Sequence, residues 1–364
     1  MTGLVIGLIV GAAVGYEVSQ SLNTKTSPPA TSPPPFTIGA AGTLTYAFNQ
    51  TLVQSFEQLY PGIKVGPPLF EGSGAVAQEE NLTKQFSLEA AADTSVMPSV
   101  LFPKIADYEI AFGITSMVTI VNLNTGPGKE VYSLWQQGQS YAPLTAQYNQ
   151  TWRQIFDIMA HNSSAVIGVS DPFTDPSGYQ AICMTKLAGQ FFFGNSSAIY
   201  DAIYGSASKT VTRSTETNLL PLMTSQDLSF IISAYKSNAI PQTKQYANTA
   251  YITLPPQINL GDMSYLSLYQ GISFSVTEQG VTQQFQCDPV VYAMTIPEPS
   301  PNPGAAALFA EDVFSPAGAQ ILSSYGITTL TPGLVYGNFT AVPDSLRPFV
   351  VPASGTFASI FPSG

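Results

Sequence analysis

Residues 165–191 read AVIGVSDPFTDPSGYQAICMTKLAGQF, and this stretch decides the fold class. Its apolar beginning, Ala165–Val169, predicts a buried strand, and Ser170–Pro176 predicts a loop. A helix follows, because apolar side chains recur at Tyr179, Cys183, Leu187 and Phe191. A strand, a short loop and a helix in this order are typical of an α/β sheet with parallel strands.

The same order occurs near the beginning of the chain and again later. Phe36–Ala41 predicts a strand, and the next helix is indicated by Leu44, Phe48, Leu52, Phe56 and Tyr60. After Pro61-Gly62, the pattern predicts a strand over Ile63–Phe70, a loop at Glu71–Gly74 and a helix over Ala75–Ala91. Leu228–Ile232 predicts another strand before Tyr235. We therefore expect an α/β fold of some size.

Composition excludes some partners. The chain has 364 residues, of which 45% are hydrophobic, so it can bury a large core. Charged residues make up only 10% and the net charge is −11, without a basic cluster, which excludes nucleic-acid binding. A surface that is polar with few charges changes little with pH, so we expect an acidic external medium.

The N-terminal residues indicate a location outside the cytoplasm. Gly3–Tyr16 is apolar but shorter than a full membrane span, so residues 1–20 are interpreted as an anchor, with a signal segment as the alternative. Residues 21–35 are rich in Ser, Thr and Pro and predict a stiff stalk. Six glycosylation acceptors follow, at Asn49, Asn81, Asn149, Asn162, Asn195 and Asn338.

Other chemistry-bearing residues do not form a catalytic or metal-binding pattern. Cys183 and Cys287 are compatible either with one disulfide or with two separate buried thiols. The single histidine, His161, is expected at the surface, and Ser233-x-x-Lys236 lacks the partner motifs of serine acyl-transfer enzymes. Adjacent acids such as Glu79-Glu80 point in different directions on a helix and are expected either on solvated faces or in the first turn of a helix. We expect neither an enzyme, nor a cofactor, nor a bound metal.

Four predicted strand-to-helix junctions carry small polar residues. They are Gly42-Thr43, Gly72–Gly74, Asp175–Ser177 and Ser233–Tyr235. In open α/β sheets such junctions line the ligand site, and helix N-termini bind anions there without Arg or Lys. Ser, Thr and Asp are also ordinary helix caps, so each junction has a purely structural interpretation as well.

Residues 168–180 read GVSDPFTDPSGYQ, and residues 254–262 read LPPQINLGD. These two stretches resemble GFSNPNDDPCGYR and LPPEINLSD in the molybdate/tungstate-binding proteins of archaeal ABC importers. Residues 289–297 and 305–318 resemble that family's last strand and C-terminal helix. The resemblance implies a periplasmic-binding-protein type II fold, in which two lobes close on an anion. Residues 36–118 plus 297–364 would form lobe I, and residues 119–296 would form lobe II.

The resemblance also implies a set of ligand-binding residues. The family's two serines and its aspartate fall on Thr43, Ser73 and Asp175, and Asp175 is the group that would approach the metal centre of the oxyanion. The family's glutamate falls on Ala234, next to Tyr235, which we include in the site. With one carboxylate fewer, we expect tetrahedral binding of molybdate or tungstate, with sulfate-like anions or another solute as alternatives. Asp175 faces an anion favourably only when it is protonated or bound to metal.

The expected function is therefore solute binding for an ABC transporter. The partners would be the oxyanion, a membrane permease and its ATPase, and the protein would stay on the outer face of the cytoplasmic membrane through its N-terminal segment. The chain has no phosphate-binding Gly-x-x-x-x-Gly-Lys motif of its own. The alternative is a glycosylated surface or adhesion protein that kept the fold and lost its ligand.

Overall fold

The stretch at 165–191 forms a strand, a loop and a helix in the computed structural model, which describes residues 33–225, 227–278 and 280–362. Strand β6 spans Ile167–Ser170 and helix α6 spans Pro176–Phe193. Asp175 caps α6 through its side chain, and Pro176 is the first helical residue. The strand, loop and helix predicted from this stretch are confirmed.

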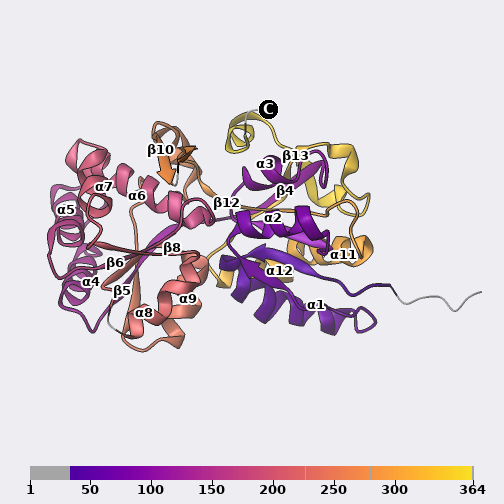
Figure 1. Cartoon of the computed structure of the whole chain (residues 1–364), viewed down its shortest axis with the longest axis horizontal. Coiled ribbons are helices and arrows are strands. Elements are labelled where there is room, and N and C mark those ends of the chain that lie inside the picture. Colours follow the sequence, from indigo (N-terminus) through magenta and orange to yellow (C-terminus); the bar gives the residue numbers. More distant parts are fainter. Residues whose placement is uncertain (1–32, 226, 279, 363–364) are drawn as a thin grey trace, which may run out of the picture. The chain divides into compact units, whose positions relative to one another are not determined.

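Helix α6 belongs to the second lobe, which is built on a five-stranded sheet (Figure 1). Its strands, in spatial order, are β7 (Thr210–Arg213), β6, β8 (Phe230–Tyr235), β5 (Met117–Asn122) and β9 (Thr249–Thr253). Its helices are α4 (Gly126–Gly138), α5 (Ala146–His161), α6, α7 (Ser197–Tyr204), α8 (Leu220–Thr224) and α9 (Lys236–Gln245). Strand β6 is parallel to β7 and β8, whereas β5 is antiparallel to both of its neighbours.

The first lobe is built on a seven-stranded mixed sheet. Its strands, in spatial order, are β14 (Val350–Pro352), β13 (Thr328–Gly337), β4 (Tyr108–Thr115), β12 (Val290–Thr295), β3 (Leu88–Ala91), β1 (Ile38–Ala41) and β2 (Leu69–Glu71). Its helices are α1 (Val53–Leu59), α2 (Ser73–Thr83), α3 (Val96–Val100), α11 (Pro303–Phe314) and α12 (Pro316–Ser324). Two sheets flanked by helices confirm the predicted α/β fold with two lobes.

Several of the sequence-based element boundaries are wrong. The strand expected over Ile63–Phe70 is β2, which spans only Leu69–Glu71, so the loop expected at Glu71–Gly74 is reduced to Gly72 between β2 and α2. The helix expected over Ala75–Ala91 is α2, which ends at Thr83, because Lys84 adopts a left-handed backbone conformation and β3 begins at Leu88. The segment Leu88-Glu-Ala-Ala favours a helix locally, but its burial between β1 and β12 makes it a strand. Ser233–Tyr235 is not a loop either, since these residues end β8.

The chain passes between the lobes twice. The first crossing runs from β4 to β5 through Ser116. The second follows the hairpin of β10 (Ser273–Glu278) and β11 (Val281–Gln286) and leads into β12. Because β12 pairs with β3 and β4, the return to the first lobe precedes Val290, whereas the expected division placed everything up to residue 296 in the second lobe.

A disulfide lies beside the second crossing. Cys183 on α6 is bonded to Cys287, which directly follows β11, so the structure decides between the two interpretations of these cysteines. A structural disulfide is typical of proteins that fold outside the reducing cytoplasm. The bond holds α6, and with it Asp175, to the segment that returns to the first lobe.

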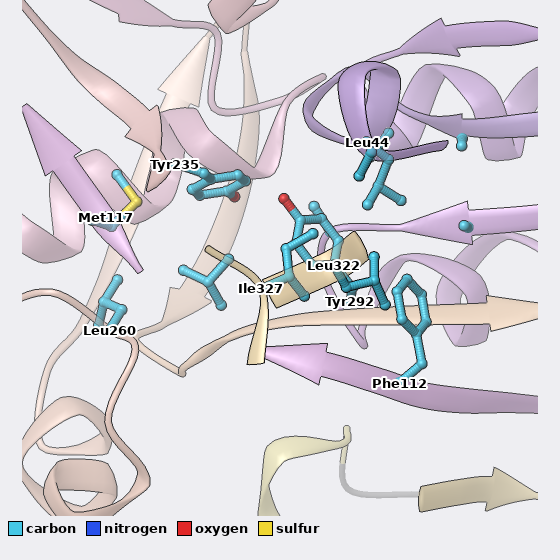
Figure 2. Close-up of a cluster of buried hydrophobic side chains, with 14 of the residues drawn as sticks. Leu44, Phe112, Met117, Tyr235, Leu260, Tyr292, Leu322 and Ile327 are labelled. Carbon is cyan, nitrogen blue, oxygen red and sulfur yellow. The ribbon is translucent and has the colours of Figure 1, made fainter. Parts of the chain in front are cut away.

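Buried hydrophobic side chains connect the two lobes beneath the crossings. Figure 2 shows Met117 and Tyr235 from the second lobe in one cluster with Leu44, Phe112 and Tyr292 from the first. The rings of Tyr235 and Tyr292 meet edge to face, with their centroids 6.4 Å apart. The lobes of the described chain thus share a core close to the candidate site.

Candidate functional site

A small cavity lies where the lobes meet. Its walls come from the end of β1 (Ala41–Thr43), the end of β2 (Glu71–Ser73), Ala92, Asp175 and the segment Thr215–Thr217. The cavity has a water-accessible volume of about 10 Å³, which is far below that of sites for organic ligands. Its occupant must therefore be small, or the lobes must separate to admit it.

The first lobe contributes two helix starts that no side chain caps. Helix α2 begins at Ser73 after Gly72, and the short 3-10 helix η1 (Gly42–Leu44) begins after Ala41, in both cases without a capping side chain. The first N–H groups of a helix carry a partial positive charge and need acceptors. Because both starts line the cavity, an anion there would supply acceptors that the protein does not.

Two hydroxyl groups of this lobe, those of Ser73 and Thr43, differ in their hydrogen bonds. Ser73 Oγ accepts a hydrogen bond of 3.0 Å from the amide of Ala92 and is therefore held in place. Thr43 Oγ1 is buried and makes no short hydrogen bond among the described residues, although it lies near enough to the Tyr292 hydroxyl to interact with it. A buried hydroxyl without a short hydrogen bond costs free energy, which a ligand in the cavity would offset.

Asp175 faces the cavity from the second lobe and also holds the local backbone. Its Oδ1 accepts a hydrogen bond from the amide of Ser177 at 3.1 Å, and its Oδ2 accepts one from the amide of Glu216 at 3.0 Å. Burial raises the pKa of Asp175, while these amide bonds oppose that rise. Asp175 thus fixes the start of α6 and the segment at Glu216 in one geometry.

The two lobes touch at Gly72. A Cβ atom at this position would overlap the carbonyl oxygen of Thr174, so only glycine allows the loop before α2 to approach Asp175 this closely. A larger groove of about 610 Å³ adjoins the cavity, with Asp175 in the walls of both. This groove is lined by uncharged polar and aromatic side chains, among them Tyr179 and Phe285, whose rings stack at 4.7 Å.

Of the four residues predicted for the site, Thr43, Ser73 and Asp175 line one cavity, whereas Tyr235 does not. Tyr235 is fully buried, and its hydroxyl donates a hydrogen bond to Gln180 Oε1. Figure 2 shows its ring directed toward Tyr292 in the shared core. The structure places Tyr235 in a packing position, and the ligand-binding role of all four stays a prediction.

Sequence reasoning missed Glu216. This residue begins the 3-10 helix η3 (Glu216–Leu219), is only 1% exposed and lines the cavity beside Asp175. Its Oε1 has no hydrogen-bond partner in the part of the chain that the structure describes. Ser-Thr-Glu-Thr after an edge strand has no recognisable motif, so only the fold reveals this second carboxyl group.

The remaining expectations concern the surface and the first residues. His161 is exposed at the end of α5, where it contacts Asp157, and the Oγ of Ser233 accepts a hydrogen bond from the amide of Ser170. Glu80 is buried and lies beyond the first turn of α2, so the expectation of a solvated face or a first-turn position is wrong; Glu80 Oε2 accepts a bond from the amide of Phe86. Burial raises the pKa of Glu80 to about 7.

The glycosylation candidates all lie at least partly open to solvent. Asn49, Asn81, Asn195 and Asn338 are exposed, and Asn149 and Asn162 are half-buried. Residues 1–20 and most of the stalk at 21–35 lie outside the described residues. In the ranges that are described, no helix has the length and apolar character needed to cross a membrane, and no three acidic, histidine or cysteine side chains are grouped to hold a metal ion.

Residues 36–328 match the family model described as bacterial extracellular solute-binding protein. The chain belongs to this family. Among similar proteins, this solute-binding protein is 28% identical over 316 residues to an uncharacterized solute-binding protein of Petrotoga mobilis, across 85% of this chain and 88% of the relative. It is 27% identical over 334 residues to the molybdate/tungstate-binding protein WtpA of Pyrococcus abyssi, again across 85% and 88%.

A solved structure supports the fold of the solute-binding protein. The periplasmic molybdate-binding protein of Azotobacter vinelandii superposes with a TM-score of 0.52 and 13% identity, over 80% of this chain and 98% of that one. At this identity the likeness shows the fold alone. Together with the relatives, it confirms the resemblance to molybdate/tungstate-binding proteins with two lobes, and nothing in it supports a surface protein without a ligand.

Proposed function

We propose that this solute-binding protein captures a tetrahedral oxyanion, molybdate or tungstate, between its lobes and delivers it to an ABC permease. One observation carries the proposal: two helix starts without a capping side chain and the buried hydroxyl of Thr43, which makes no short hydrogen bond, line one cavity between the lobes. Uncapped amides and hydroxyls bind anions by hydrogen bonds that need no Lys or Arg. The role is binding rather than catalysis.

The roles of the individual residues follow from their hydrogen bonds. The first amides of α2 would donate to oxygens of the anion, and Ser73, whose Oγ already accepts from Ala92, would hold that helix start in place. The Thr43 hydroxyl would donate its proton to the anion. Asp175 would keep the opposite wall in position through Ser177 and Glu216.

The proposal extends to the place where the protein works. The N-terminal segment would tether it to the outer face of the cytoplasmic membrane, the stalk would extend it away, and glycans would occupy the acceptor asparagines. The disulfide between Cys183 and Cys287 supports a location outside the cytoplasm. An acidic medium would suit the many buried carboxyl groups.

Calorimetric titration of the full chain with sodium molybdate, sodium tungstate and sodium sulfate tests the proposal. We expect saturable one-to-one binding of molybdate or tungstate, weakened about tenfold or more by Thr43→Val, which removes a single hydrogen bond to a charged ligand. Thr328→Val, at an exposed position of β13 outside the cavity lining, serves as the matched control. Absence of binding for all three anions at acidic and neutral pH would refute the proposal.

A further inference from the structure

We propose that Glu216 is a ligand-binding residue of the anion site and that it binds with its carboxyl group protonated, donating a hydrogen bond to an oxygen of the anion. This inference rests on the proposed function and adds two things to it. It names a residue that determines which anions bind, and it makes binding depend on a proton.

The position of Glu216 is fixed by two hydrogen bonds. Its backbone amide donates to Asp175 Oδ2 at 3.0 Å, which anchors the start of η3 against the start of α6. Its Oε2 accepts a long hydrogen bond of 3.4 Å from the amide of Tyr235. Its Oε1 makes no short hydrogen bond within the described ranges, although the Asn238 side chain interacts with the carboxyl group, and the residue lines the cavity. One carboxyl oxygen is thus held by a backbone amide, and a ligand in the cavity would compete only with the Asn238 side chain for the other.

No basic side chain forms an ion pair with Glu216 in the described residues. The titratable groups that interact electrostatically with Glu216 are Asp175 at the start of α6, Tyr235 on β8, Tyr292 on β12 and Tyr46 on the π-helix η2 (Thr45–Leu52). Glu71, at the end of β2, lines the same cavity. Across residues 33–225, 227–278 and 280–362, the only ion pairs are His161 with Asp157 and Arg347 with Asp344, both far from it in sequence.

Such an environment favours the neutral acid. Burial, and next the neighbouring Asp175, raise the pKa of Glu216 well above its usual value. Asp175 has two amide donors that stabilise its charge, so the proton of the pair belongs on Glu216. A charged Glu216 would repel the ligand, whereas its acid form places an O–H donor where an anion oxygen needs one.

The proton balance gives the expected pH dependence. Where free Glu216 is ionised, binding of the anion requires uptake of one proton from solution. Affinity should then fall about tenfold for each pH unit above the pKa of free Glu216, and should be constant below it. The inference therefore predicts a receptor that loads in acid and releases its ligand as the pH rises.

Calorimetry of the full chain with sodium molybdate, from pH 5 to pH 8, tests this. Titrations at one pH in two buffers of different ionisation enthalpy count the protons, and we expect about one taken up per anion at any pH where free Glu216 is ionised and none where it is protonated. Glu216→Gln keeps a neutral donor of the same shape, so it should bind in acid within about threefold of the original protein and lose the pH dependence. Glu216→Ala should weaken binding in acid about tenfold or more. Glu130→Gln, on an exposed part of α4, is the matched control.

Two results would overturn the inference while leaving the proposed function intact. One is a folded Glu216→Ala protein that binds molybdate in acid within about threefold of the original protein. The other is a folded Glu216→Gln protein that keeps the original pH dependence, since the ligand's own protonation would then explain it. Failure of the original protein to bind any oxyanion would instead refute the proposed function, so the two failures are distinguishable.

Discussion

Glu89 and Glu109 should make the protein less stable as the pH rises. They lie on β3 and β4, the two strands on either side of β12, and are almost completely buried. Neither carboxyl group has a hydrogen-bond partner among the described residues. Burial first, and nearby acids second, raise the pKa of both well above the usual value. The folded protein therefore retains protons that the unfolded chain releases.

The size of the effect follows from linkage. An unfolded glutamate has a pKa of about 4.3, so each buried group lowers the free energy of unfolding by about 1.4 kcal/mol per pH unit above that value, until the pH reaches its folded pKa. The stabilisation is complete below the pKa of the unfolded glutamate. It is lost as the pH rises from that value to the pKa of the folded group. For Glu89 and Glu109 together, the slope is about 2.7 kcal/mol per pH unit.

Urea denaturation at pH values from 4 to 7 measures this slope directly. A double variant, Glu89→Gln with Glu109→Gln, has no ionisable group at these two positions. The difference between its free energy of unfolding and that of the original protein should therefore increase, in favour of the variant, as the pH rises. Glu130→Gln, at the surface, should show no such growth. A constant difference between the double variant and the original protein across this range would refute the reasoning.

Three further predictions concern the lobes and the cavity. Gly72→Ala should weaken anion binding by about tenfold or more in calorimetry, because its methyl group would meet the carbonyl of Thr174 and keep the lobes apart; unchanged affinity would contradict this. Reducing the bond between Cys183 and Cys287, which are 104 residues apart, should lower the free energy of unfolding by up to about 4.7 kcal/mol, and unfolding curves with and without reductant measure it. Thr43→Val should leave stability unchanged or raise it by about 1 kcal/mol, since the hydroxyl makes no short hydrogen bond in the described structure; a large loss would show that the hydroxyl supports the fold.

Local chemistry determined what could be predicted from the sequence. The segment at 165–191 was predictable because its strand is continuously apolar and Asp175-Pro176 is a strong start signal for a helix. The segment at 88–91 was not, because Leu-Glu-Ala-Ala favours a helix locally and only its neighbours β1 and β12 make it a strand.

The candidate site shows the same limit. Thr43, Ser73 and Asp175 follow strands or begin helices, so their positions in the chain indicate a shared edge. Glu216 reaches the cavity from a loop after the edge strand β7, and its burial depends on contacts with Asp175 and Tyr235 that are distant in sequence. Tyr235 ends β8 with its side chain buried outside the cavity lining, because this strand is longer than the apolar pattern indicates, and its ligand-binding role stays a prediction.

The bond between Cys183 and Cys287 closes a loop that contains most of the second lobe after α6 begins. Extracellular proteases attack exposed turns, and several turns lie within this loop. A single cut there would break the backbone without releasing a fragment, since both ends stay attached through the sulfur atoms. Asp175 ahead of the loop and Glu216 inside it would remain parts of one covalent molecule. The disulfide would therefore keep the second lobe attached to the protein after a single proteolytic cut within this loop.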